Sequence, residues 1–289
     1  MKFSFDRDSL LKEISISQDV IATKNAISIL SNVLLNAENG TLTIKATDIK
    51  INFETKIPVD ISEPGSTTVY CDKFMSIISS LPPGEIEFEQ KDIKIHIRSV
   101  AKKAKFQLKS IASDKFPEFA SPDTVSFFDL PVRTFKEMIT QTVFSVSDDE
   151  TRYFMNGVFM EKKESDLIFV ATDGRRLAYI KKDLGISIPD FKGVIIPPKI
   201  LSIILKRASD EGPISIGVSD KTVFFRFNNY DFSSVLIEGQ FPNYSRVIPE
   251  TQTSYFEVEK RDLVEALKRV ALLVEQKSRR VYLSVSPGT

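Results

Sequence analysis

The chain has 289 residues, of which 42% are hydrophobic and 27% are charged, and its 39 basic and 39 acidic side chains leave no formal net charge. These values exclude a disordered tail, a collagen-like repeat and a strongly basic nucleic-acid-binding chain. The length predicts two or three domains, each large enough to bury a core. Cys71 is the single cysteine, which excludes an intrachain disulfide and favours a reducing, cytoplasmic location. Neither a signal peptide nor a membrane span is recognisable, so we expect a soluble protein with no membrane partner.

The predicted elements alternate between helices and many short strands. Apolar residues at helical spacing predict five helices, over residues 9–16, 72–81, 132–143, 198–208 and 260–273. Between them, short segments alternate apolar and polar residues, as at 42–46, 93–97 and 214–216. A period of two is typical of strands with one buried face. The fold class is therefore α+β, with sheet dominant.

Internal repetition is the most informative feature of the sequence. Ala46-Thr47-Asp48 recurs as Ala171-Thr172-Asp173 at a shift of 125 residues. Further matches, at shifts of 124 to 126, pair residues 11–13 with 135–137, Asn32 with Asn156, 73–78 with 199–204 and 116–119 with 241–244. Collinear matches at a nearly constant shift predict a tandem duplication. Each unit is expected to run strand, helix, several strands, second helix, several strands.

The repeats predict three domains of unequal length. Polar, turn-forming stretches near residues 120–124 and 249–253 suit the joints between domains. They give a first domain over 1–122, a second over 123–252 and an incomplete third over 253–289, roughly 90 residues shorter than a full copy. We expect a chain of this length to be mostly monomeric.

Positive charge gathers on the expected helices. Counted with their first turns, the five helical segments carry twelve basic and seven acidic side chains, so they hold a net charge of +5 and the rest of the chain −5. Such a chain can meet a polyanion at its helices and repel it elsewhere. An ordinary solvated helix face has the same composition, so both interpretations stay open.

Three motifs carry a resemblance to a known family. They are the runs Arg152-Tyr153-Phe154-Met155-Asn156-Gly157, Ala171-Thr172-Asp173-Gly174-Arg175-Arg176-Leu177-Ala178 and Phe241-Pro242-Asn243-Tyr244-Ser245-Arg246-Val247-Ile248-Pro249. In this order and spacing they resemble the bacterial sliding clamp, the beta subunit of DNA polymerase III, and the likeness extends along the whole chain. The resemblance implies tandem repeats of the DNA clamp fold, each with antiparallel sheets outside and two helices on the inner face.

The resemblance also implies a function. Family members are processivity factors whose chains dimerise head to tail into a ring around double-stranded DNA and tether the polymerase. Six repeats with two helices each give twelve helices, and packed axes about 9–10 Å apart form a circle roughly 110–120 Å around. Subtracting a helix width of about 10 Å leaves an opening of roughly 25–28 Å, which admits a duplex. Because a ring holds DNA by topology, weak contacts suffice, and a neutral total charge is compatible with this function.

A peptide-binding pocket is the main site that the resemblance implies. Asp173-Gly174 is first of all a hairpin turn, and Asp48 holds the equivalent place in the first repeat. The repeats then diverge, so a function confined to one copy should lie here. Polymerase, clamp-loader and repair proteins would insert a short hydrophobic peptide at the positions that match the family pocket, which are Met155, Thr172, Gly174, Arg175, Arg176, Leu177, Pro242, Arg246 and Val247. Arg175 stands where the family often has His.

Two further surfaces follow from the same resemblance. For DNA, the resemblance points to Lys24 and to the loop with Asp149, Tyr153 and Phe154, and the cations of the predicted helix 198–208 add Lys199, Lys206 and Arg207. The acidic run 148–150 departs from the family, and Arg152 is a candidate ion-pair partner within that loop. A homodimer is expected when the chain is full length, with its interface at Phe106, Leu108, Leu272 and Leu273, for which an ordinary core position is the alternative.

The sequence carries no recognisable catalytic or cofactor motif. The single histidine, His96, lies on the polar face of a predicted strand and is expected to be exposed, and no zinc or P-loop signature is present. We therefore expect no enzyme activity, no metal and no cofactor. Two alternatives stay open: a truncated monomeric peptide-binding module, and an acid/base hydrolase that uses Asp173.

Overall fold

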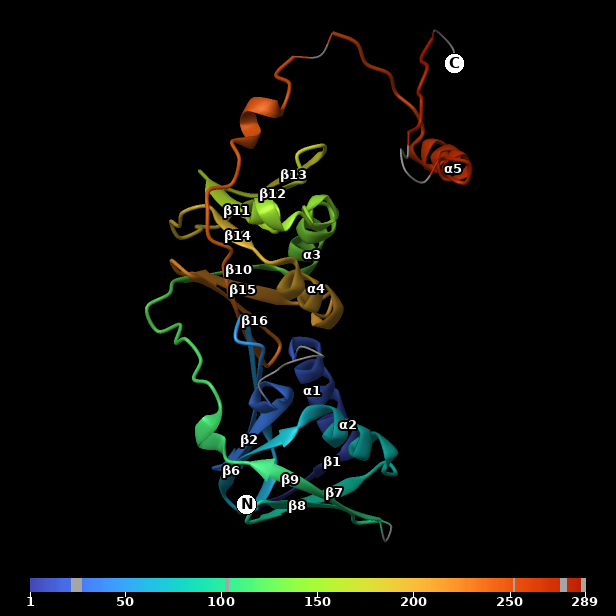
Figure 1. Cartoon of the computed structure of the whole chain (residues 1–289). Coiled ribbons are helices and arrows are strands. Elements are labelled where there is room, and N and C mark those ends of the chain that lie inside the picture. The colour runs from blue at the N-terminus through green and yellow to red at the C-terminus, as the bar shows by residue number, and fades with distance from the viewer. Residues whose placement is uncertain (22–27, 102–103, 252, 276–279, 287–289) are drawn as a thin grey trace. The chain divides into compact units, whose positions relative to one another are not determined.

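The computed structural model describes residues 1–21, 28–101, 104–251, 253–275 and 280–286. The chain divides into two compact units, Met1–Pro242 and Asn243–Thr289, and each is described by itself (Figure 1). Within the described ranges, no helix is both long and apolar enough to cross a membrane.

The first unit contains two copies of one succession of elements. The first copy consists of β1 (Lys2–Asp6), α1 (Arg7–Val20), η1 (Ser28–Ser31), β2 (Asn32–Glu38), β3 (Thr41–Thr47), β4 (Ile51–Pro58), β5 (Asp60–Glu63), β6 (Gly65–Tyr70), α2 (Cys71–Ser80), β7 (Glu85–Lys91), β8 (Lys94–Ser99), β9 (Lys105–Ile111) and η2 (Ser113–Lys115). The second consists of β10 (Phe127–Pro131), α3 (Val132–Thr140), η3 (Val143–Ser145), η4 (Glu150–Met155), β11 (Val158–Lys163), β12 (Asp166–Thr172), β13 (Leu177–Asp183), β14 (Val194–Ile196), α4 (Pro198–Arg207), β15 (Pro213–Val218), β16 (Thr222–Phe227) and β17 (Tyr230–Val235). The predicted duplication is confirmed.

Local chemistry explains where the helices begin. The Asp6 carboxylate accepts a hydrogen bond of 2.9 Å from the backbone N–H of Ser9 and so caps α1. That bond lowers the pKa of Asp6 below its usual value. The cap places the start of α1 at Arg7, earlier than the expected residue 9, while α4 begins at Pro198, where a missing N–H costs nothing.

Burial along the helices sets the alignment of the two copies. Leu10 and Ile14 of α1 are fully buried, as are Phe135 and Ile139 of α3. These pairs are related by a shift of 125 residues. The match of residues 11–13 with 135–137 at a shift of 124 is therefore wrong by one position, because it would align buried side chains with half-buried ones.

One continuous sheet joins the two copies. It has 13 strands in the order β10-β15-β16-β17-β4-β3-β2-β6-β9-β8-β7-β1-β5, and a second sheet has four, β13-β12-β11-β14. The connection between the copies is the antiparallel pair β17–β4, which runs from Tyr230 opposite Thr55 to Ser234 opposite Ile51. The joint predicted near residues 120–124 therefore separates the copies in sequence, whereas their sheets remain hydrogen-bonded.

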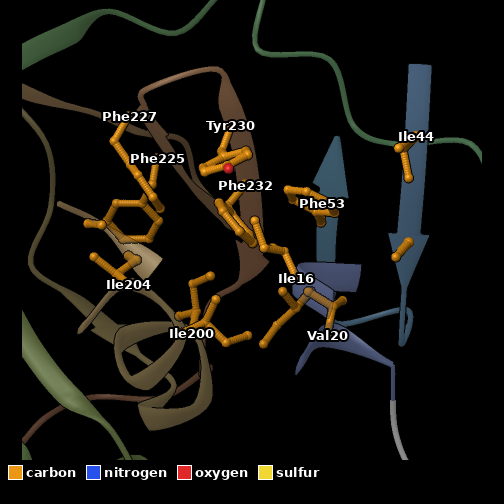
Figure 2. Close-up of a cluster of buried hydrophobic side chains, with 14 of the residues drawn as sticks. Ile16, Val20, Ile44, Phe53, Ile200, Ile204, Phe225, Phe227, Tyr230 and Phe232 are labelled. Atoms are coloured by element: carbon orange, nitrogen blue, oxygen red, sulfur yellow. The ribbon is translucent and has the colours of Figure 1, made fainter. Parts of the chain in front are cut away.

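A shared hydrophobic core lies beneath this joint (Figure 2). Ile16 and Val20 of α1 meet side chains of α4, represented by Ile200, and the rings of Phe53 and Phe232 lie 4.9 Å apart across the β4–β17 pair. Burial of these side chains stabilises the packing of the two copies into one unit. Each Å² of apolar area removed from water contributes roughly 25 cal/mol to the free energy of folding.

The helices of the first unit share one side of the strands. In Figure 1, α1, α2, α3 and α4 lie on the same side, and the connection after β9 runs along the other. On that other side the strands present polar residues, as the alternating burial of β4 indicates. This arrangement agrees with the expected helical inner face and strand outer face.

His96 differs from its expected exposure. It lies in β8 directly between Glu89 of β7 and Gln107 of β9, and it is half-buried. Long side chains directly opposite on both neighbouring strands cover its ring, which a single-strand pattern does not reveal.

The second unit contains η5 (Tyr244–Val247) and α5 (Lys260–Ala271). The apolar side chains of α5 that repeat at helical spacing are not buried within the described residues, and Leu267 and Val270 are exposed.

Candidate functional site

The β12–β13 turn of the second copy is built by hydrogen bonds from Thr172 and Asp173. The Thr172 hydroxyl donates to the backbone O of Arg176 at 2.7 Å and accepts from the N–H of Gly174 at 3.1 Å. Gly174 has φ +84°, a left-handed conformation that glycine adopts without strain. The Asp-Gly turn that the sequence predicted is confirmed.

The Asp173 carboxylate is fully engaged in this turn. One oxygen accepts from the N–H groups of Arg175 at 2.9 Å and Arg176 at 3.0 Å, and the other accepts from Arg176 Nε at 3.1 Å. The backbone N–H of Arg175 is the main cause that lowers the pKa of Asp173, while partial desolvation acts in the opposite direction. Both oxygens of Asp173 are therefore occupied by hydrogen bonds within the turn.

Arg176 ties the turn to the preceding segment. Its Nη2 donates to the backbone O of Phe144 at 2.8 Å, and its guanidinium lies 5.8 Å from the centre of the Phe144 ring. Arg152 also approaches the turn, since a Cβ placed on Gly174 would lie 2.8 Å from Arg152 Nη1. The sequence did not identify Phe144, because its contribution is a backbone carbonyl that no side-chain pattern marks.

The first copy contains the same turn without the glycine. Thr47 Oγ1 donates to the backbone O of Ile51 at 3.0 Å and accepts from the N–H of Ile49 at 2.9 Å. Asp48 Oδ1 accepts from the backbone N–H groups of Lys50 and Ile51, at 3.0 and 2.7 Å. Ile49 has φ +78°. A β-branched residue in that conformation is strained.

The structure places the predicted pocket residues on several elements. Met155 ends η4 and is buried, Leu177 begins β13 and is half-buried, and Pro242 is half-buried next to Phe241, which stacks on Phe159 with ring centres 4.8 Å apart. Arg175 is exposed on the turn. The two remaining residues, Arg246 and Val247, lie in η5 of the second unit and are exposed.

The loop predicted to contact DNA is ordered by its own side chains. Asp149 Oδ1 accepts from the N–H and the hydroxyl of Thr151, at 3.0 and 2.6 Å, and Asp149 Oδ2 accepts from Arg152 Nε at 2.9 Å. The Thr151 hydroxyl is the first cause that lowers the pKa of Asp149. The expected ion pair of Arg152 within this loop is therefore confirmed. Tyr153 is exposed and its ring centre lies 5.8 Å from that of Phe154. Lys24 lies outside the described residues.

The three candidate cations of α4 all reach acceptors of the first copy. Lys199 Nζ donates to Asp48 Oδ2 at 2.6 Å and to the backbone O of Val20 at 2.7 Å. Lys206 Nζ donates to Asp19 Oδ1 at 2.7 Å, and Arg207 forms an ion pair with the same carboxylate. The roles of these cations in DNA binding stay a prediction. Asp19 was not singled out from the sequence, although an acid in the last turn of a helix opposes the helix dipole and indicates an external cationic partner.

The four candidate interface residues fall into two groups. Phe106 and Leu108 are half-buried on β9 and pack against the core, whereas Leu272 and Leu273 are 83% and 93% exposed. Residues 105–109 pair with β8 along one edge, and β6 pairs only with Ser110 and Ile111 on the other. Within the described residues, the second edge of 105–109 therefore makes no strand pairing.

Comparisons with known proteins agree along the whole chain. Residues 1–120 match the N-terminal domain of the DNA polymerase III beta subunit, and residues 129–243 match its central domain. The beta sliding clamp of Treponema pallidum is 46% identical over 288 residues, which cover 100% of this chain and 78% of the relative. The beta sliding clamp of Escherichia coli is 32% identical over 289 residues, covering 99% and 78%.

Solved structures of the same kind resemble the fold. A DNA polymerase sliding clamp from Bacillus subtilis superimposes with a TM-score of 0.92 at 28% identity, covering 96% of this chain and 75% of that one. A sliding clamp from Pseudomonas aeruginosa bound to griselimycin gives a TM-score of 0.88 at 28% identity, covering 96% and 76%.

Proposed function

Because this chain belongs to the beta sliding clamp family of DNA polymerase III beta subunits, we propose that it is a non-catalytic processivity factor that encircles double-stranded DNA as a head-to-tail homodimer. The observation that carries this proposal is the joint between the first two repeats. It combines a continuous outer sheet with helices on one side only. Repetition of such a joint would continue a wall that is helical inside and stranded outside. We assign the domains to residues 1–122, 123–252 and 253–289.

The ring would close by a second joint of the same kind between two chains. The first joint uses α4 and β17 of one repeat against α1 and β4 of the other. Their counterparts for closure are α2 and β9 of the first repeat, and α5 of the third repeat in a partner chain. Phe106 and Leu108 hold the places of Asp231 and Ser233, at a shift of 125.

The counterparts at the two joints differ in polarity. Ser233 accepts a hydrogen bond from Asn52 across the first joint at 3.0 Å. Apolar side chains at the matching places of β9, together with its open edge, suit hydrophobic association between separate chains.

We assign the peptide pocket to the surface beside the β12–β13 turn. Leu177 and Pro242 offer apolar contact, and the exposed guanidinium of Arg175 is available to carbonyl or carboxylate groups of a bound peptide. The polymerase catalytic subunit, the clamp loader and repair proteins would each present a short hydrophobic motif to this pocket.

The peptide pocket is tested by Leu177→Ala in the full-length protein. We expect at least a tenfold loss of affinity for a polymerase C-terminal peptide, measured by fluorescence anisotropy, because truncation of an apolar anchor costs about 1–3 kcal/mol. Arg176→Ala should also weaken binding, since it loosens the turn. The matched control is Leu184→Ala, a half-buried leucine of the same copy away from the turn. Unchanged affinity in Leu177→Ala would refute the pocket assignment.

Encirclement is tested with nicked circular DNA. The full-length protein, loaded by its clamp loader, should stay on the circle and be lost within minutes after linearisation, because a topological link depends on the absence of ends. Equal retention on circular and linear DNA would contradict encirclement and favour a peptide-binding module.

A further inference from the structure

Asp19 and Asp48 form ion pairs with three cations of the helix layer, by which we mean helices α1 to α4. Lys206 donates to Asp19 Oδ1 at 2.7 Å, and Lys199 donates to Asp48 Oδ2 at 2.6 Å. Arg207 is bound more fully than either lysine, because it pairs with Asp19 and also donates to both the backbone O and the hydroxyl of Ser15, at 2.8 and 3.2 Å. Lys199 adds one bond, to the backbone O of Val20 at 2.7 Å. All three cations come from α4, and all their acceptors come from the other repeat.

The three cations differ in how easily a phosphate could reach them. The side chain of Lys206 is 61% exposed and that of Lys199 is 42% exposed, whereas that of Arg207 is 19% exposed. Ion pairs of exposed lysines contribute little and exchange readily. Arg207 therefore stabilises the joint between the repeats. A phosphate could replace Asp19 as the partner of Lys206, and Asp48 as the partner of Lys199.

Other cations of the same helices are not held in this way. Lys12, Lys73 and Arg133 are exposed and form no ion pair within the described residues. The helix layer thus contains open cations and cations that already have a carboxylate partner. Only the open ones can bind phosphate without first losing a partner.

We propose that Asp19 and Asp48 act as internal counter-ions that compete with DNA phosphate for Lys206 and Lys199, and so limit how tightly the protein holds the duplex. The proposal rests on the proposed function, because it requires the helix layer to face DNA. Affinity for a duplex rises with each phosphate that is neutralised. A cation that must first leave a carboxylate adds less affinity, which keeps contacts weak enough for sliding.

Asp19→Asn and Asp48→Asn in the full-length protein test this inference. Binding to a short linear duplex should be measured by anisotropy over a range of salt concentrations. In Asp19→Asn, the slope of log K against log salt should steepen by about 0.9 for the release of Lys206. Asp48→Asn should steepen the slope by less, because Lys199 keeps its hydrogen bond to the backbone O of Val20. The matched control is Asp72→Asn, which removes the same charge from helix α2. Asp72 accepts from Gln18 at 2.9 Å and holds no cation within the described residues. Its slope should stay that of the wild type.

Lys206→Gln completes a double-mutant cycle. In the wild-type background it should change the slope little, and in the Asp19→Asn background it should remove the gained slope. A full loss of about 0.9 from Lys206→Gln alone would overturn the inference, because Lys206 would then already contact phosphate, and this variant removes only an exposed group. An equal effect of Asp19→Asn and Asp72→Asn would also overturn it. Failure of the wild-type protein to bind duplex at any salt concentration would instead refute the proposed function.

Discussion

At the scale of single residues, the turn found in both copies differs at one position of positive φ, and this difference affects stability. Ile49 and Gly174 hold the same place in two turns that use the same hydrogen bonds, and both have positive φ. Glycine tolerates this conformation, whereas isoleucine is strained by about 1–2 kcal/mol. Ile49 is 57% exposed, so its side chain recovers little of that cost through burial.

Ile49→Gly is therefore expected to stabilise the protein. The unfolding free energy should rise by about 1 kcal/mol, measured by chemical denaturation, because relief of strain outweighs the added freedom of the unfolded chain. The matched control is Ile93→Gly, in the turn before β8, where the isoleucine is 63% exposed and does not have positive φ. That change should cost roughly 0.5–1 kcal/mol. A loss of stability in both variants would show that Ile49 is not strained.

Gly174→Ala should act in the opposite direction. Positive φ disfavours alanine, and the added Cβ would meet Arg152 Nη1. We expect a loss of about 1–2 kcal/mol in denaturant unfolding, together with weaker peptide binding because the turn supports Leu177. Full stability and affinity in this variant would contradict the requirement for glycine.

At the scale of elements, α1 carries a buried carboxylate into the joint between the repeats. Glu13 is 6% exposed and accepts a hydrogen bond from the Tyr230 hydroxyl of β17 at 3.2 Å, while its Oε2 has no partner within the described residues. Burial is the main cause that raises the pKa of Glu13 above its ordinary value, and the Tyr230 bond opposes it only in part.

The raised pKa of Glu13 predicts how stability depends on pH. The folded chain binds this proton more tightly than the unfolded chain does, so the contribution to stability is present below the ordinary glutamate pKa and is lost as the pH rises through the folded value. Glu13→Gln should thus raise the unfolding free energy at pH 8 by roughly 1 kcal/mol, and the gain should disappear near pH 4. Thermal unfolding at several pH values measures this.

Glu54→Gln in β4 is a control of opposite sign. Partial burial acts to raise the pKa of Glu54, but the ammonium groups of Lys45 and Lys56, at 2.8 and 3.1 Å, outweigh it and lower that pKa. Its contribution to stability is present above the ordinary glutamate pKa and is lost as the pH falls, so Glu54→Gln should destabilise the protein at pH 8. A pH-independent effect of Glu13→Gln would contradict burial of a charge.

The sequence predicts helices, strands and turns better than it predicts which of them pair or pack together. The repeats, all five helices and the Asp173-Gly174 turn depend on local patterns, and each was recognised within a few residues. The Lys-Glu match aligns the two copies one residue out of register, because such a pair is a weaker marker than the burial of Leu10 and Phe135. The β4–β17 ladder and the partners of Asp19 could not be predicted, since they join segments more than 170 residues apart.

At the scale of the whole molecule, the joint within the chain and the proposed joint between chains make different demands. Leu272 and Leu273 come twelve and thirteen residues after the first residue of α5, as Asp19 and Val20 do in α1. Asp19 serves a permanent joint within one chain through ion pairs. Leucine in the corresponding place suits the proposed joint between separate chains, where burial of apolar surface would supply the affinity.

Leu273→Asp in the full-length protein should therefore weaken self-association at least tenfold, because a buried unpaired carboxylate is costly at an apolar interface. Sedimentation at several protein concentrations measures the dissociation constant. Lys260→Asp, which introduces the same side chain at the start of α5, should leave association nearly unchanged. A dimer of unaltered strength in Leu273→Asp would place the interface elsewhere.

The β4–β17 ladder has a mechanical consequence. Five consecutive residue pairs, flanked by a core common to both copies, leave no pliable link at residues 51–55 and 230–234. Twisting one copy against the other would shear backbone hydrogen bonds that act in parallel, and their combined stiffness resists such motion. If the ring that we propose opens to admit DNA, the deformation should be absorbed outside the ladder formed by residues 51–55 and 230–234.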